Sequence, residues 1–225
     1  GRWLLALAWN ASLEVAHVYG HHRDVGTRAD PATARRDEHV YAFFVRSTLG
    51  QVRQAWHIER QRLAGSSAWQ ALVWRNKVSR GFMRSTAVAA GFLLAAGGSG
   101  LAMFLVASMW NKLLLEALNY LEHYGLVRDG ATPYALRHAW DTDRAFSHVV
   151  LINLPMHSEH HLDPRTHFEG LAQRPESPLL PCGYLAALLL TLLPPVWRRL
   201  MAPRLADWDR RLATDEERDL IGSAR

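Results

Sequence analysis

Cysteine is almost missing from this sequence, which narrows the chemistry open to it. Among 225 residues only Cys182 is a cysteine, so the chain cannot form an internal disulfide and has no cysteine framework for zinc or an iron–sulfur cluster. Any bound metal must therefore depend on other ligands. Histidine is the abundant alternative: there are twelve, and seven of them fall in three short groups.

Nucleic-acid motifs and an export signal are missing as well. A net charge of +5 and a pI near 9.8 would suit nucleic acid, an anionic membrane surface or an acidic protein. The basic residues, however, form no finger, RNA-recognition signature or basic helix ahead of heptads, so we expect no nucleic-acid partner. Residues 3–9 are apolar without the layout of a signal peptide, and we expect a fragment that begins inside a membrane helix.

The mean hydropathy of −0.12 conceals one long apolar run. Residues 87–110 form a stretch of 24 positions without a charge, which exceeds the ~20 needed to cross a bilayer. The glycine-rich cluster at residues 97–100 allows either one helix with a weak centre or a hairpin of two helices, over residues 82–96 and 101–120. We favour the hairpin, because it places Glu122 and His123 at the watery end.

Charged segments flank this run. Residues 23–84 carry twelve Lys/Arg against five Asp/Glu, and they predict a water-facing region with an amphipathic helix over residues 38–63 and an aromatic membrane anchor from Trp69 to Trp74. Because residues 198–225 are also rich in arginine, both segments and the histidine groups are expected on the cytoplasmic side. The basic loops also suit an acidic redox partner.

The three histidine groups have the spacing of ligand sets on helices, where residues three or four apart share a face. Seven imidazoles are too many for one tetrahedral zinc site, so two metal ions are the economical inference. Copper is compatible by affinity, but histidine clusters at the ends of membrane helices favour iron that activates O2. The predicted metal ligands are His17, His21, His22, His123, His157, His160 and His161.

The remaining histidines are scattered, and we expect them to be surface or supporting residues: His39, His57, His138, His148 and His167. Glu14 lies three positions before His17. A hydrogen bond from an imidazole and a hydrated helix-end carboxylate are equally compatible with that position.

The motifs around the histidines resemble those of a known family, the membrane alkane 1-monooxygenases, within the larger group of histidine-box hydroxylases and desaturases. His17-Val-Tyr-Gly-His21-His22 is similar to the second box of the family, and Leu154-Pro-Met-His157-Ser-Glu-His160-His161 to its third. Asn119-Tyr-Leu-Glu-His123-Tyr-Gly-Leu126 is similar to the signature that separates alkane hydroxylases from desaturases.

The resemblance implies an all-α fold: one partial domain over residues 1–225, an integral-membrane helical bundle with a cytoplasmic di-iron site. The ligands would be the seven histidines above and two more in a first box, H-E-x-x-H, expected upstream of Gly1. The implied reaction hydroxylates the terminal carbon of an alkane to a 1-alkanol, with O2 as cosubstrate and electrons from rubredoxin, separate or fused. The implied location is the bacterial inner membrane, in contact with membrane lipid.

Two alternatives stay open. The chain is also compatible with another histidine-box enzyme, an alkylaromatic monooxygenase or a fatty-acyl desaturase or hydroxylase. It also fits a truncated, non-catalytic membrane fragment that merely binds metal. Helical spacing marks residues that could line an apolar substrate channel in the first two cases: Leu101, Phe104, Leu105, Ser108 and Leu115.

Overall fold

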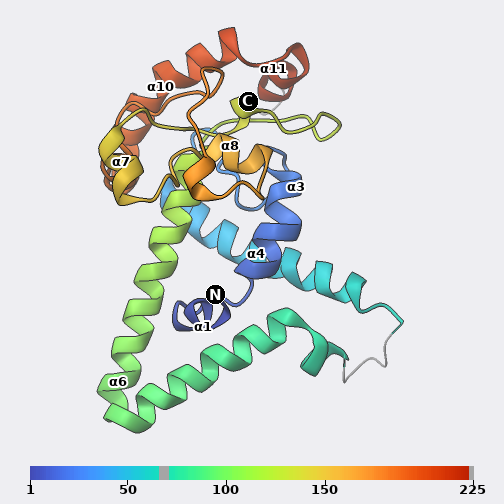
Figure 1. Cartoon of the computed structure of the whole chain (residues 1–225), viewed down its shortest axis with the longest axis vertical. Helices are drawn as coiled ribbons and strands as arrows, with labels where there is room; N and C mark the ends of the chain where they lie inside the picture. The colour runs from blue at the N-terminus through green and yellow to red at the C-terminus, as the bar shows by residue number, and fades with distance from the viewer. Residues whose placement is uncertain (66–70, 223–225) are drawn as a thin grey trace. The chain divides into compact units, whose positions relative to one another are not determined.

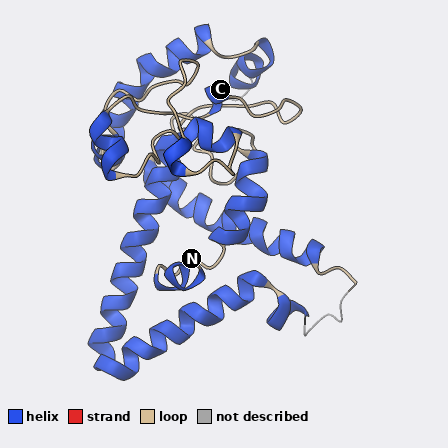
Figure 2. Cartoon of the chain, viewed as in Figure 1, coloured by secondary structure: helices blue, strands red, loops and turns tan. Residues whose placement is uncertain are grey.

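The protein is all-α, as predicted. The structure, a computed structural model, describes residues 1–65 and 71–222, and within them it contains helices, turns and loops but no β-strand (Figure 2). The helical segments are α1 (Arg2–Leu7), α2 (Leu13–Val15), the π-helix η1 (Ala16–His21), α3 (His22–Asp24), α4 (Val40–Arg62), the π-helix η2 (Ala71–Arg75), α6 (Lys77–His123), the 3-10 turn η3 (Leu136–His138), α7 (Ala145–Val150), α8 (His157–Leu162), the 3-10 turn η4 (Phe168–Gly170), α9 (Tyr184–Thr191), α10 (Pro194–Arg211) and α11 (Asp215–Gly222).

The chain divides into two compact units. The first comprises Gly1–Arg23 and Arg46–Glu116, and the second comprises Asp24–Val45 and Ala117–Arg225. The division falls inside the long helices α4 and α6. The first histidine group thus belongs to the first unit, whereas His123 and the third group belong to the second.

The glycine-rich part of α6 is a tight turn, which confirms the predicted hairpin. The helix is broken at Ala96 (φ −138°, ψ 19°) and Gly97 (φ +62°, ψ −151°), and Figure 1 shows α6 turning back on itself. Gly97 supplies the left-handed φ that other residues adopt at a cost. At Gly100 a Cβ would collide with the Phe92 carbonyl, so glycine allows the two arms to meet. Phe92 and Phe104 stack beside the turn, 5.3 Å between ring centroids.

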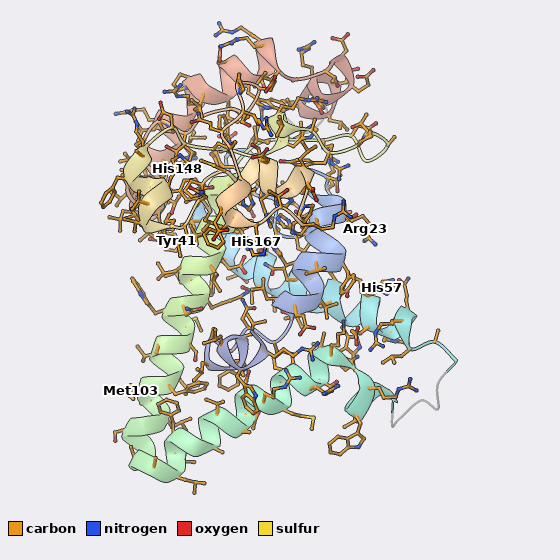
Figure 3. The ribbon with its side chains drawn as sticks, viewed as in Figure 1. Arg23, Tyr41, His57, Met103, His148 and His167 are labelled. Atoms are coloured by element: carbon orange, nitrogen blue, oxygen red, sulfur yellow. The ribbon has the colours of Figure 1, made fainter. Side chains whose placement is uncertain are left out.

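The arms of α6 in the first unit expose an apolar surface. The helix is long and apolar enough to cross a membrane, and its most apolar 18-residue window is only 17% buried. Leu94 is 87% exposed, and Met103, labelled in Figure 3, is 60% exposed. An exposed apolar surface of this kind is unusual on a soluble monomer and is typical of a surface that contacts a membrane or another protein.

Polar contacts tie the second arm of α6 to the N-terminal segment. The Ser108 hydroxyl donates to the Leu7 carbonyl at 3.0 Å. Four residues further on, the Lys112 ammonium donates to the Asn10 side-chain oxygen at 3.3 Å and pairs with Glu116 at 2.5 Å.

Among the channel-lining residues expected from helical spacing, Phe104 and Ser108 are buried.

The predicted helix over residues 38–63 is present as α4, with polar Gln51 and Glu59 as well as Phe43 on its buried face. The predicted aromatic anchor is only partly visible. Trp69 lies outside the described residues, and Trp74 is 64% exposed, as an interfacial side chain would be.

Aromatic side chains fill the core of the second unit. The last turn of α6 contributes Tyr120, and Tyr124 directly follows the helix; their rings are 5.0 Å apart. Phe43 packs on Tyr120 at 5.4 Å, and Trp197 of α10 packs on Tyr124 at 5.7 Å. Since His123 lies between the two tyrosines in sequence, this packing fixes the helix end that presents it.

Candidate metal centre

The first histidine group lies where the helix widens. In the π-helix η1, hydrogen bonds join residues five positions apart, so residues i and i+5 lie on one face. The ring centroids of His17 and His22 are therefore only 4.7 Å apart, and those of His17 and His21 are 5.2 Å apart. The sequence predicted convergence on an ordinary helix, and the π turn brings His22 closer to His17 than that geometry allows.

Close packing on α4 holds this turn in place. Val15 and Ala16 are buried in a small apolar cluster with Ala55 of α4. At Gly20, between the histidines, a Cβ would collide with the Gln54 side chain. His21 is consequently buried, whereas His17 and His22 are half-buried.

Glu14 has a partner that the sequence did not predict. Its two carboxylate oxygens accept hydrogen bonds from the Arg2 guanidinium, each at 2.8 Å, and the side chain stays partly exposed. These hydrogen bonds lower the pKa of Glu14. The partner comes from α1, twelve positions away, where helical spacing gives no signal.

The second unit brings three imidazole nitrogens together. Nε2 of His157 lies 3.2 Å from Nε2 of His123 and 3.0 Å from Nε2 of His161. All three side chains are buried, and one comes from the end of α6 while two come from the single turn and a half of α8. The fourth histidine, His160, is half-buried, and its ring centroid is 5.8 Å from that of His157.

This donor set fits a metal ion. Two imidazole nitrogens that each lie about 2.1 Å from one ion are about 3 Å apart when their bonds are at right angles. The separations around His157 Nε2 have this value. A single ring nitrogen carries at most one hydrogen, and so one nitrogen facing two others at this distance is better satisfied by a shared cation than by hydrogen bonds alone. Imidazole suits iron, copper and zinc.

The orientation of His123 is set by a backbone carbonyl. Nδ1 of His123 lies 3.2 Å from the carbonyl oxygen of His138. A carbonyl only accepts, so Nδ1 carries the hydrogen, and the lone pair of Nε2 faces His157. Fixing the tautomer from the far side of the ring is the usual support for a metal-binding histidine.

Glu122 adds a carboxylate that was not predicted from the sequence as part of the site. It is buried, and Oε2 lies 3.3 Å from Nε2 of His157. The Tyr184 hydroxyl donates to the other carboxylate oxygen at 3.4 Å. Its position directly before His123 in the signature motif was the available signal. A carboxylate here offsets the positive charge of a cation bound by neutral imidazoles.

Asp141 holds the start of α8. It is fully buried and accepts the Ser158 backbone N–H at 2.9 Å and the Ser158 hydroxyl at 2.6 Å. Burial raises the pKa of Asp141 to about 6, although the hydrogen bonds from Ser158 oppose that rise. Because Ser158 follows His157, this carboxylate fixes the turn that presents the third histidine group.

The other histidines are exposed or make supporting contacts, as expected. His39, His57 and His167 are exposed, and His148 is half-buried with Nε2 2.8 Å from the Thr142 carbonyl (Figure 3). His138 is fully buried and supports His123 through its carbonyl. Its sequence surroundings gave no helical partner, so only the tertiary structure shows this role.

Comparison with known proteins gives a consistent result. The sequence model of the fatty acid desaturase family matches residues 1–176. An alkane 1-monooxygenase of Pseudomonas putida is 36% identical over 219 residues, which are 92% of this chain and 54% of that protein. Alkane 1-monooxygenase 1 of Alcanivorax borkumensis is 34% identical over 92% of this chain and 53% of its own length.

A relative with a different name matches over even more of the chain. The xylene/toluene monooxygenase hydroxylase component XylM of Pseudomonas putida is 35% identical over 226 residues, 98% of this chain and 60% of that protein. The chain spans about half the length of the curated relatives it matches. All seven predicted ligands fall within the segment that the family model matches.

Proposed function

Because this chain belongs to the fatty acid desaturase family, we propose that it is a membrane histidine-box monooxygenase with two non-haem iron ions. The main support is the convergence of Nε2 of His123, His157 and His161 in the second unit. Bound iron would supply the activation of O2. The proposed iron ligands are His17, His21, His22, His123, His157, His160 and His161.

The protein's own residues would hold and shield this chemistry. The His138 carbonyl keeps His123 as the tautomer whose Nε2 can bind a cation. Asp141 fixes the turn that carries His157, and buried Glu122 beside His157 balances part of the added charge. Burial of these groups keeps bulk water away, which strengthens their electrostatic interactions.

The proposed substrate is an alkane, hydroxylated at its terminal carbon to a 1-alkanol with electrons from rubredoxin. Support comes from the alkane 1-monooxygenases among the relatives. An alkane offers no charge or hydrogen bond, so apolar contacts alone must position it. The α6 arms supply apolar side chains such as Phe104 and Leu105. The arginine-rich segment at residues 23–84 suits an acidic electron donor.

The proposed location is the bacterial inner membrane, with the histidines on the cytoplasmic side and one domain extending over the chain. The low burial of the apolar window in α6 supports insertion into lipid, since the core helix of a soluble protein is mostly buried. The excess of arginine in residues 23–84 supports the orientation.

A second candidate is hydroxylation of a methyl group on an aromatic ring. The observation that favours it is the match to the xylene/toluene monooxygenase component over 98% of this chain. Both reactions use the same oxygen chemistry, and they differ in the shape of the apolar site.

Product analysis separates the two candidates. Membranes containing the full-length protein would be supplied with O2, a rubredoxin reducing system and either octane, hexadecane or p-xylene. We expect 1-octanol or 1-hexadecanol, and no product when His157 is replaced by alanine. His167→Ala, at an exposed histidine outside the clusters, is the matched control and should keep activity. Product from xylene alone would support the second candidate, and no product from any substrate would contradict the proposal.

A further inference from the structure

One carboxylate near the C-terminus, that of Glu217, is buried although it carries a charge. Glu217 of α11 is fully buried, and it lies outside the segment that the family model matches. Burying an ionised carboxylate costs several kcal/mol unless hydrogen bonds and opposite charge compensate. Glu217 has both kinds of partner, and they are Thr214, directly before α11, together with Arg137 and His138.

The partners of Glu217 satisfy both carboxylate oxygens. Oε1 accepts from Nε2 of His138 at 2.7 Å and from Nη2 of Arg137 at 3.1 Å. Oε2 accepts from Nε of Arg137 at 3.2 Å and from the Thr214 backbone N–H at 2.9 Å. The carboxylate therefore accepts hydrogen bonds from two consecutive residues of η3 at the same time.

The tautomer and charge of the His138 ring follow from its other contacts. The Ala135 backbone N–H donates to Nδ1 of His138 at 3.0 Å, so Nδ1 is an acceptor and the hydrogen is on Nε2, which donates to Glu217. Burial lowers the pKa of His138 despite the nearby carboxylate, in agreement with a neutral ring. Both ring nitrogens thus form hydrogen bonds, and the ring cannot rotate without losing one of them.

The His138 backbone continues this chain of contacts to the histidine cluster. Its carbonyl accepts from Nδ1 of His123 at 3.2 Å, and Nε2 of His123 lies 3.2 Å from Nε2 of His157. Trp208 of α10 also stabilises η3, because its indole N–H donates to the Arg137 carbonyl at 2.7 Å. Two hydrogen bonds, one to the His138 side chain and one to its carbonyl, therefore connect α11 with His123, a predicted metal ligand.

We propose that Glu217 is a positioning residue for the metal centre: by holding the His138 side chain, it aims the His138 carbonyl at Nδ1 of His123 and so fixes the direction of His123 Nε2. The inference rests on the proposed function, because it concerns the affinity of the histidine cluster for its metal. It assigns the C-terminal helix a role in the site, beyond its packing in the core.

The alternative is a carboxylate that only stabilises the fold. Metal affinity distinguishes the two, because a purely structural loss lowers the unfolding temperature and leaves the assembled ligand set unchanged. Loss of a group that supports a metal-bound histidine typically weakens metal binding about 10–100-fold. We therefore expect Glu217→Ala to weaken Fe²⁺ binding by about 10-fold and to change the visible absorption spectrum of the Co²⁺-loaded protein.

The conservative substitution gives a separate expectation. In Glu217→Gln the amide oxygen can still accept from His138, while the amide nitrogen faces the donors Arg137 and Thr214. Fe²⁺ affinity should therefore return to within about threefold of the unsubstituted value while the melting temperature stays low. Glu216→Ala, at the exposed neighbour on the same helix, is the matched control and should change neither quantity.

The experiment is an anaerobic titration of the full-length, detergent-extracted apoprotein with Fe²⁺, followed by Co²⁺ spectra and thermal unfolding. If Glu217→Ala and Glu216→Ala bind Fe²⁺ equally well, the positioning role is overturned while the proposed function stands. If the unsubstituted protein binds no Fe²⁺, the proposed function itself fails. Should Glu217→Ala not fold, His138→Phe removes the same hydrogen bond from the other side, and unchanged Fe²⁺ affinity in that variant overturns the inference.

Discussion

The buried carboxylate of Asp141 predicts a pH dependence of stability that can be measured without metal. Burial raises its pKa from 3.8 to about 6, so the folded protein holds a proton that the unfolded chain releases. Stability therefore falls as the pH rises from about 4 to above 6. A difference of about two pKa units corresponds to about 3 kcal/mol at 1.36 kcal/mol per unit.

Asp141→Asn isolates this contribution. The side-chain oxygen of asparagine can still accept the Ser158 backbone N–H, and its amide can donate to the Ser158 hydroxyl, so the turn of α8 keeps its anchor without an ionisable group. The free energy of unfolding of the apoprotein in detergent would be measured for both forms between pH 4 and pH 7.5. Relative to the unsubstituted protein, we expect Asp141→Asn to gain about 3 kcal/mol over this range.

Other titrating groups affect both proteins and cancel in the difference. Asp143→Asn, at an exposed aspartate two residues away, is the matched control and should show no such gain. A difference between Asp141→Asn and the unsubstituted protein that stays constant over the whole pH range would refute the reasoning, because it would mean that burial does not perturb this carboxyl group.

Two further predictions concern the first unit. Gly100→Val should lower the melting temperature, because the new side chain would collide with the Phe92 carbonyl and overpacking costs about 1–3 kcal/mol. Gly98→Val, at a position with open space, is the control and should leave the melting temperature unchanged. Equal effects of the two substitutions would argue against a close approach of the arms. Glu116→Ala should cost about 3–5 kcal/mol of unfolding free energy by leaving Lys112 buried without its countercharge, and replacing both residues by apolar ones should restore most of it. A double variant as unstable as Glu116→Ala would contradict this account.

The sequence predicted those features that depend on local spacing or composition. The convergence of histidines within one group follows from helical periodicity, and the all-helical fold follows from the resemblance of the histidine motifs to a known family. The hairpin in α6 follows from a glycine cluster in an apolar run, because Gly97 is the residue that adopts a positive φ there. These are properties of short segments, and short segments are visible in sequence.

Contacts between distant segments could not be predicted in this way. Glu14 is paired with Arg2 across a loop, and His138 gains its role from a carbonyl that faces a helix fifteen residues earlier in the chain. The π-helix at His17 depends on packing against α4, which residue spacing does not reveal. The supporting groups of a site are therefore harder to predict than its metal ligands, since their partners are set by tertiary structure.

The central claim is that the histidine groups of this chain hold two iron ions. The most direct measurement is the iron content of the full-length protein purified under anaerobic conditions, together with that of His157→Ala, in which the shared neighbour of His123 and His161 is removed. We expect close to two iron ions per chain in the first and at least one fewer in the second. Iron well below one per chain in the unsubstituted protein, or equal iron in both, would contradict the claim.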